Sequence, residues 1–169
     1  MMERILVLLC AFVLFVSGAV AATQKCPASS ATMHAGCETQ LQFKDSCSSV
    51  RNEINKRVSG QFDAWYDPHN NGTYTFAAKA DSLYQLSRLT GDKKYTDLIN
   101  FVFEDAGTGC NVAACSESQV FSIGDYGTNY CNILDLYCSD ARCKPFSKLE
   151  YTETVGKCTE VSPDKCFAK

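Results

Sequence analysis

The amino-acid sequence predicts an α+β fold, in which one amphipathic helix packs on an antiparallel sheet and disulfide bonds staple the structure. Apolar residues recur at helical spacing in one early segment, and short alternating segments separated by turn residues follow it. The chain of 169 residues also holds 11 cysteines. Its length is typical of one domain, and a hydrophobic content of 46% is too high for a disordered chain.

The first segment has the pattern of a secretion signal. Ile5–Val16 is an apolar run after a short polar start, and Ala19-Val20-Ala21 matches the small-residue site that signal peptidase cleaves. A membrane anchor is the alternative, but a spanning helix needs about 20 apolar residues, and Ile5–Val16 is shorter than that. We therefore expect residues 1–21 to be a signal peptide and residues 22–169 to be a single secreted, disulfide-rich α+β domain.

The cysteine count agrees with secretion. Cys10 lies in the predicted signal, so ten cysteines remain, and an even number in a secreted chain predicts five disulfides. Zinc is the alternative, because some spacings resemble those of zinc ligands, but an oxidising compartment removes thiolates and no histidine lies near those pairs. The cysteines expected to pair are Cys26, Cys37, Cys47, Cys110, Cys115, Cys131, Cys138, Cys143, Cys158 and Cys166.

Short spacing favours three local disulfides, because neighbouring cysteines reach bonding geometry without closing a long loop. These are Cys110–Cys115, Cys138–Cys143 and Cys158–Cys166.

The first regular elements come before residue 60. Residues 22–44 show no sustained period, which predicts a loop with a short strand near Leu41–Phe43. A helix is predicted next, capped by Asp45 or Ser46 and ended by Gly60. Its apolar stripe consists of Cys47, Val50, Ile54 and Val58.

Turn chemistry and alternation predict strands after the helix. Asn71-Gly72 between aromatic segments predicts the tip of a β-hairpin, with a strand at Thr73–Phe76. The turn Thr90-Gly91-Asp92 separates strands expected at Leu83–Leu89 and Tyr95–Glu104. The same leucines also fit a helix–turn–helix over residues 82–103, but the aromatic and β-branched content favours strands.

The last strands are expected beyond a third turn at Gly107-Thr108-Gly109. One is predicted at Gln119–Ile123, and another at residues 131–138, where Leu134 and Leu136 would share a face.

Several short motifs stand out between residues 47 and 145. They are Cys115–Val120, Asp125–Asn132, Leu136–Cys138, Asn70–Tyr74 and Thr90–Asp97. This pattern resembles small secreted cysteine-rich proteins of algae and other protists. The resemblance implies secretion and supports strands over helices for residues 82–103, and it brings no catalytic residue with it.

The predicted outline, one helix followed by an antiparallel meander, is similar to that of cystatin-like and NTF2-like folds. Cystatins use a Gln-x-Val-x-Gly loop and a Pro-Trp hairpin. Here the glycine of Gln119–Gly124 falls one residue late, and the only tryptophan, Trp65, is not beside a proline. An NTF2-like cavity could hold a small apolar ligand.

The sequence offers no catalytic residue. His34 and His69 lie in no metal or nucleophile motif, and Asp67 with His69 fits a turn better than an acid–base pair. Paired carboxylates of a glycoside hydrolase are the alternative, and Glu117, Asp125 and Asp135 are the residues that could supply them. We expect no metal and no cofactor.

Charge and surface chemistry narrow the partners. With 16 Lys and Arg against 19 Asp and Glu and no basic run, the chain has no footprint for nucleic acid. Asn71-Gly72-Thr73 is an N-glycosylation sequon, and its predicted place at a hairpin tip would expose Asn71. Once the predicted signal is removed, the sequence has no second apolar run of a length that would suggest a membrane span.

The surface stretch Ser116–Asn129 is the expected binding segment, because it combines adaptable polar side chains, tyrosines and glycines between two groups of cysteines. A twisted strand with glycine bulges is the alternative. The candidate binding residues are Gln119, Asp125, Tyr126, Asn129 and Tyr130.

These observations favour a secreted extracellular binding or interaction protein without catalysis. Its partner would be an extracellular protein, a glycan or a small apolar ligand. The alternatives are a carrier of a small apolar ligand, which would need a cavity of about 300 Å³ or more, a protease inhibitor, and a small secreted hydrolase.

Overall fold

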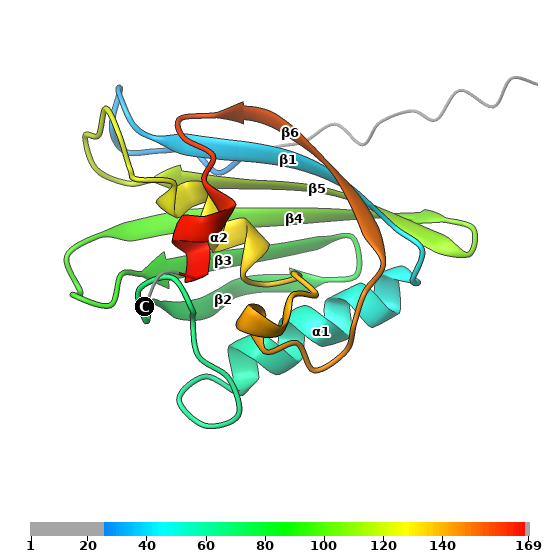
Figure 1. The fold of residues 1–169 in the computed structure, drawn as a ribbon. Coiled ribbons are helices and arrows are strands. Elements are labelled where there is room, and N and C mark those ends of the chain that lie inside the picture. The colour runs from blue at the N-terminus through cyan, green and yellow to red at the C-terminus, as the bar shows by residue number, and fades with distance from the viewer. Residues whose placement is uncertain (1–25, 168–169) are drawn as a thin grey trace, which may run out of the picture.

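The computed structural model describes residues 26–167, so the predicted signal peptide and Cys10 lie outside the described residues. The described part is an α+β structure with six strands, two α-helices and two short 3₁₀-helices (Figure 1). In chain order these are β1 (Gly36–Phe43), α1 (Cys47–Ser59), β2 (Thr73–Ala80), β3 (Leu83–Leu89), β4 (Thr96–Ala106), β5 (Gly109–Ser118), α2 (Thr128–Leu134), η1 (Ala141–Cys143), β6 (Tyr151–Cys158) and η2 (Pro163–Phe167).

The six strands form one sheet in the order β2-β3-β4-β5-β1-β6, and every neighbouring pair is antiparallel. Both helices lie on the same face of this sheet (Figure 1). Cys47 of α1 is bonded to Cys110 of β5, and Asn132 of α2 contacts Ser116 of the same strand. Because residues 110 and 116 are an even number apart, their side chains share that face.

The helix α1 forms where its apolar stripe predicts it. The side chain of Ser46 accepts a hydrogen bond from the Ser49 backbone N–H, and the helix ends at Gly60. The stripe is buried against the sheet, with Val50 and Ile54 fully inaccessible. The predicted helix and its N-cap are therefore confirmed.

A second strip of α1, beside the apolar stripe, is also buried, which the amphipathic pattern did not predict. Glu53 and Arg57 are fully buried and form an i,i+4 ion pair at 2.8 Å. Glu53 accepts backbone N–H bonds from Phe146 and Ser147, and Arg57 donates to the carbonyls of Asp135 and Cys138. The helix thus contacts both the sheet and the segment that follows α2, and its remaining side is exposed.

The prediction of strands for residues 82–103 is confirmed, because β3 and β4 are joined by the turn at Thr90-Gly91-Asp92. Ile99, Phe101 and Phe103 alternate along β4 and are buried on the helix-covered face. The turn at Gly107-Thr108-Gly109 joins β4 to β5, as predicted.

The predicted hairpin at Asn71-Gly72 is wrong. The strand that follows it, β2, pairs only with β3, and residues 61–72 form a loop with a single bridge between Gln61 and Trp65. Trp65 is buried with its indole N–H donating to the Cys143 carbonyl, so the aromatic residue before the turn belongs to the core. Its burial, not cross-strand pairing, explains the aromatic content.

Two predicted strands near the C-terminal half are also wrong. Gln119–Ile123 is a loop, because the strand lies just before it, in β5. Residues 131–138 belong mainly to α2 and the turns after it, and all eight are buried. When every side chain of a segment is buried, apolar spacing no longer separates a helix from a strand.

The edge strand β6 escaped the sequence analysis, and β1 is longer than the short strand expected near Leu41–Phe43. Most of β6 is exposed, so its residues need no apolar alternation. Its pairing with β1 is shown by the cross-strand partners Phe43 and Tyr151.

All ten cysteines from Cys26 onward form disulfides, in line with the oxidising environment that they predict. Of the three local pairs, Cys138–Cys143 is confirmed and the other two are wrong. Cys110 and Cys115 both lie on β5, an odd number of residues apart, so they point to opposite faces of the sheet. The observed pairs are Cys26–Cys115, Cys37–Cys158, Cys47–Cys110, Cys131–Cys166 and Cys138–Cys143.

None of the helices between residues 26 and 167 is long and apolar enough to cross a membrane.

Candidate functional site

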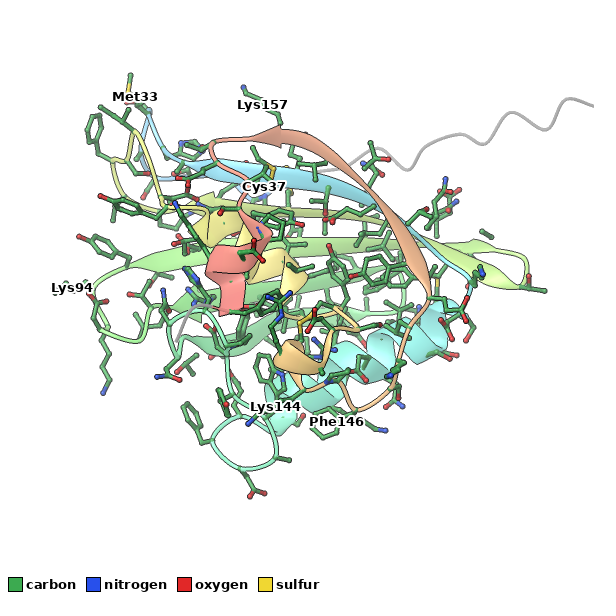
Figure 2. All side chains as sticks on the ribbon, in the orientation of Figure 1. Met33, Cys37, Lys94, Lys144, Phe146 and Lys157 are labelled. Carbon is green, nitrogen blue, oxygen red and sulfur yellow. A yellow bond between two sulfur atoms is a disulfide. The ribbon has the colours of Figure 1, made fainter. Side chains whose placement is uncertain are left out.

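A cavity of about 580 Å³ opens at the end of the sheet where β3 and β5 finish and β4 begins. Figure 2 shows Lys94, from the β3–β4 turn, at this end of the molecule, away from Lys144 and Phe146 beside α1. The cavity is lined by Asn70, Thr90, Gly91, Asp92, Tyr95, Asp97, Ser118, Val120, Phe121, Ser122, Gly124, Asp125, Tyr126 and Thr128.

The loop carrying Asn70 is held in place by a buried ion pair. The Asp67 carboxylate accepts hydrogen bonds from the backbone N–H groups of His69 and Gly72 and from Arg88 Nε at 2.9 Å. Arg88 also donates to the Asn70 side chain at 2.6 Å. Both charged groups are inaccessible to solvent, so this pairing of β3 with the loop is a rigid wall of the cavity.

Close backbone approach completes that wall. A Cβ atom at Gly91 would lie 1.9 Å from the carbonyl oxygen of Asn70. Only glycine lets the β3–β4 turn meet the Asn70 loop this closely.

The cavity floor is a connected polar network between the sheet and α2. Asp97 accepts from Ser118 Oγ at 2.9 Å and from Asn132 Nδ2 at 2.8 Å. Asn129 donates to Ser118 and to Asp125, both through Nδ2. The Ser116 hydroxyl joins the two asparagines, donating to Asn129 Oδ1 at 2.6 Å and accepting from Asn132 at 3.0 Å. A connected buried network of this kind restricts its members to one arrangement.

The rim is aromatic and exposed. Tyr126 is 79% exposed and Phe121 is 68% exposed, and Tyr95 lies across from them on the β3–β4 turn. Tyr126 adopts a left-handed φ of 55°, which is unusual for a bulky residue. Asp125 stabilises the bend beside it by accepting the backbone N–H groups of Gly127 and Asn129.

Behind the floor lies a buried acid. Asp135 is fully inaccessible, and burial together with the neighbouring Asp67 carboxylate raises the pKa of Asp135 well above its usual range. Burial is also the main reason why the pKa of the Tyr74 phenol, next to Arg88, is raised. The interior therefore favours the protonated form of Asp135.

The five predicted binding residues divide between the cavity and its support. Asp125 and Tyr126 line the cavity. Asn129 is fully buried beneath it, and Tyr130 is buried with its hydroxyl donating to Glu153 at 3.0 Å. Gln119 donates to the Ala28 carbonyl and accepts from the Ser30 backbone N–H, so it holds the N-terminal segment.

The cavity also contains residues that the sequence analysis did not select. Asn70 comes from the loop before β2, Asp92 and Tyr95 come from the β3–β4 turn, and Asp97 comes from the start of β4. The turn signals at residues 70–72 and 90–92 were visible in the sequence, but nothing in the chain indicated that these two turns meet.

The three carboxylates considered for hydrolysis occupy separate places. Asp125 lines the cavity, Asp135 is buried behind it, and Glu117 points to the opposite face of the sheet, where it contacts His34 at 2.7 Å. Asp67 and His69 form no acid–base pair, since Asp67 accepts from the His69 backbone and the imidazole contacts Thr128 and Lys165.

A smaller cavity of about 380 Å³ lies around His34 on that opposite face, with Glu38, Glu117 and Lys157 in its lining. Burial raises the pKa of Glu117, against the opposing effect of His34. Cys26, Glu38 and Glu117 lie within metal-ligand distance of one another, but Cys26 is bonded to Cys115 and offers no thiolate.

Asn71 is exposed, although the hairpin that was expected to expose it is absent. It has a left-handed φ of 58° in the loop immediately before β2.

Comparison with known proteins leaves the chain without a family. No family model matches it, and no curated protein matches it. Among solved structures, the chain is similar to the Mll3558 protein from Rhizobium loti, with 10% identity, a TM-score of 0.40, and coverage of 58% of this chain and 88% of that chain.

Proposed function

We propose that this chain is a secreted binding protein without catalysis, whose ligand site is the cavity at the end of the sheet. The observation that carries the proposal is the coincidence of an exposed aromatic rim with a rigid polar floor. Tyr126 and Phe121 expose large ring surfaces at the mouth of a cavity of about 580 Å³, a size typical of small-molecule sites.

The rigidity of the walls supports binding. The Asp67–Arg88 pair and the Asn129 network tie together the loops that form the cavity, and the Cys131–Cys166 disulfide anchors α2, which carries Asn129. A site whose polar groups are already fixed loses little conformational entropy when a ligand enters. Secretion and glycosylation at the exposed Asn71 belong to this proposal, and the disulfides support the oxidising compartment that it requires.

Among the kinds of protein considered from the sequence, the cavity favours a carrier of a small ligand over a protease inhibitor or a hydrolase. We propose an NTF2-like outline in preference to a cystatin-like one, because the floor of the cavity lies on the helix-covered face of the sheet. An inhibitor would need an exposed wedge of loops, and the hydrolase considered from the sequence would need Glu117, Asp125 and Asp135 to converge, whereas these three lie apart.

A matched pair of variants tests the site. Tyr126 and Phe62 are 79% and 78% exposed, and both have a left-handed φ, but only Tyr126 lines the cavity. Tyr126→Asn and Phe62→Asn each remove an exposed ring and insert a residue that tolerates this backbone conformation. We expect ligands from a small-molecule library, detected by ligand-observed NMR, to lose at least about tenfold in affinity in Tyr126→Asn, the scale of a central aromatic contact.

Phe62→Asn is the control and should bind like the unmodified protein. Ligands that bind equally well to both variants would place binding elsewhere on the surface and contradict the proposal. A screen without any ligand that depends on Tyr126 would do the same.

A further inference from the structure

We propose that the ligand of this cavity is an organic cation, an ammonium group carried on an aromatic or aliphatic body. The inference rests on the proposed binding function and names its ligand class. It is carried by three features of the cavity: the charge of its lining, the charge of the groups behind its floor, and the ammonium contacts that its own lysines already make.

The lining carries acids and no bases. Asp92, Asp97 and Asp125 contribute carboxyl groups, and no lysine, arginine or histidine is among the lining residues. Asp97 is nearly inaccessible, and its two hydrogen bonds come from the neutral donors Ser118 and Asn132. Neither donor brings a positive charge to Asp97, and a low surrounding dielectric strengthens the field of a buried carboxylate.

The interior behind the floor does not neutralise this charge. Arg88 lies opposite Asp97 on the neighbouring strand, but its guanidinium is already paired with Asp67. One cation is thus shared by two carboxylates. Burial raises the pKa of Asp135 well above its usual range, which favours the uncharged form of this third acid. The floor therefore carries net negative charge, and a cationic ligand would balance it.

Lysines of the chain already place ammonium groups at two lining residues. Lys94 Nζ lies 3.4 Å from the Asp92 carboxylate, and Lys165 Nζ lies 5.9 Å from the centre of the Tyr126 ring. The Lys94 side chain is 69% exposed. An incoming ammonium can displace it at little cost, since exposed ion pairs contribute little stability. A ligand cation would then have both a carboxylate and an aromatic face.

The spacing of the acids favours an organic ion over a metal ion. Within residues 26–167, Cys26, Glu38 and Glu117 bring three possible ligand atoms within 4.8 Å of one another, and no such group lies at this cavity. A single Ca²⁺ needs six to eight oxygen ligands at short range. Carboxylates distributed around a cavity of about 580 Å³ instead suit a ligand large enough to reach the aromatic rim and an acid together.

Three probes that share a phenylethyl group and differ in charge test the charge of the ligand. Titrations of the mature protein at pH 7 would compare 2-phenylethylammonium, 2-phenylethanol and 3-phenylpropanoate by protein NMR. We expect the ammonium to bind at least about tenfold more tightly than the alcohol, the scale of one charge-assisted hydrogen bond, and the carboxylate to bind most weakly. The preference should shrink as salt is added, because part of the lining is exposed.

Asparagine variants locate the charge. Asp92→Asn removes an exposed carboxylate on a turn, and Asp125→Asn keeps one oxygen, which can still accept the N–H groups of Asn129. Each should weaken binding of the ammonium several-fold and leave binding of the alcohol within about twofold. Glu104→Gln changes an exposed carboxylate at the other end of β4 and should leave both unchanged.

The outcomes separate this inference from the function on which it rests. An alcohol that binds as tightly as the ammonium, and loses affinity in Tyr126→Asn, would overturn the cation and leave the binding function standing. Ammonium binding that survives both aspartate variants would overturn the assignment of these acids. If no probe binds at millimolar concentration, the cation is overturned, while the library screen described above decides the function separately.

Discussion

At the scale of single residues, the molecule is distinguished by the number of charged and polar groups that it buries. Glu53, Arg57, Asp67, Arg88 and Asp97 are all at most 2% exposed. Each has a specific partner, as buried charges require. Asp135 is the exception, because its carboxyl oxygens have no hydrogen-bond partner other than the contact with Asp67 that helps to raise its pKa.

This raised pKa has a consequence for stability. As the pH rises above about 3.8, the unfolded chain loses the Asp135 proton while the native protein keeps it. The native state then binds more protons than the unfolded state, so the free energy of unfolding falls with rising pH until the native group also ionises. Asp135→Asn removes this contribution, since its amide is neutral at every pH.

We therefore expect the difference in melting temperature between Asp135→Asn and the unmodified protein to grow in favour of the variant between pH 4 and pH 8, by a few degrees. Thermal unfolding followed by circular dichroism at several pH values measures it. Asp105→Asn, which changes an exposed carboxylate on β4, is the control. A difference that stays constant with pH would show that Asp135 is ionised in the native protein.

At the scale of elements, α1 connects the two layers of the molecule. The helix packs on the sheet through Val50 and Ile54, and the neighbouring Glu53 and Arg57 hold the segment after α2. Loss of its packing would release both layers at once.

Ile54→Asp should therefore abolish the secretion of folded protein. An unpaired carboxylate in this fully buried position costs several kcal/mol, against a total stability of about 5–15 kcal/mol. Asn52→Asp adds the same charge at an exposed position of the same helix and should leave yield and melting temperature nearly unchanged. Folded Ile54→Asp protein with a normal melting temperature would show that α1 is not packed on the sheet.

At the scale of the whole molecule, four of the five disulfides join segments that are far apart in the chain. The bond Cys37–Cys158 spans 121 residues and ties the edge strand β6 to β1, whereas Cys138–Cys143 spans 5 residues. If a disulfide acts mainly by restricting the unfolded chain, the longer loop should contribute more.

Replacing both cysteines of a pair by alanine tests this scaling. We expect a loss of about 5 kcal/mol for Cys37–Cys158 and about 2 kcal/mol for Cys138–Cys143, from the entropy of loop closure. Denaturant unfolding of the two double variants measures the difference, and peptide mapping of the unmodified protein verifies the pairs. Equal losses would contradict the entropic account, and a linked Cys110–Cys115 peptide would contradict the fold itself.

The sequence by itself determined the α+β class, helix α1 with its Ser46 cap, and the strands β3 and β4. These depend on local signals, namely apolar spacing, capping and turn residues, which act within a few positions of the chain. It also determined that the cysteines pair, because an even count is independent of connectivity.

Only the tertiary structure decided how these parts meet. The local spacing of Cys110 and Cys115 suggested a bond, but a strand places them on opposite faces. Residues of α2 were predicted as a strand because residues 129–134 are all buried, and apolar spacing then no longer separates a helix from a strand. The same holds for the cavity, whose walls come from turns near residues 70, 92 and 125. Their contact depends on strand order and on a close approach at Gly91, which are long-range properties that no local pattern in the sequence records.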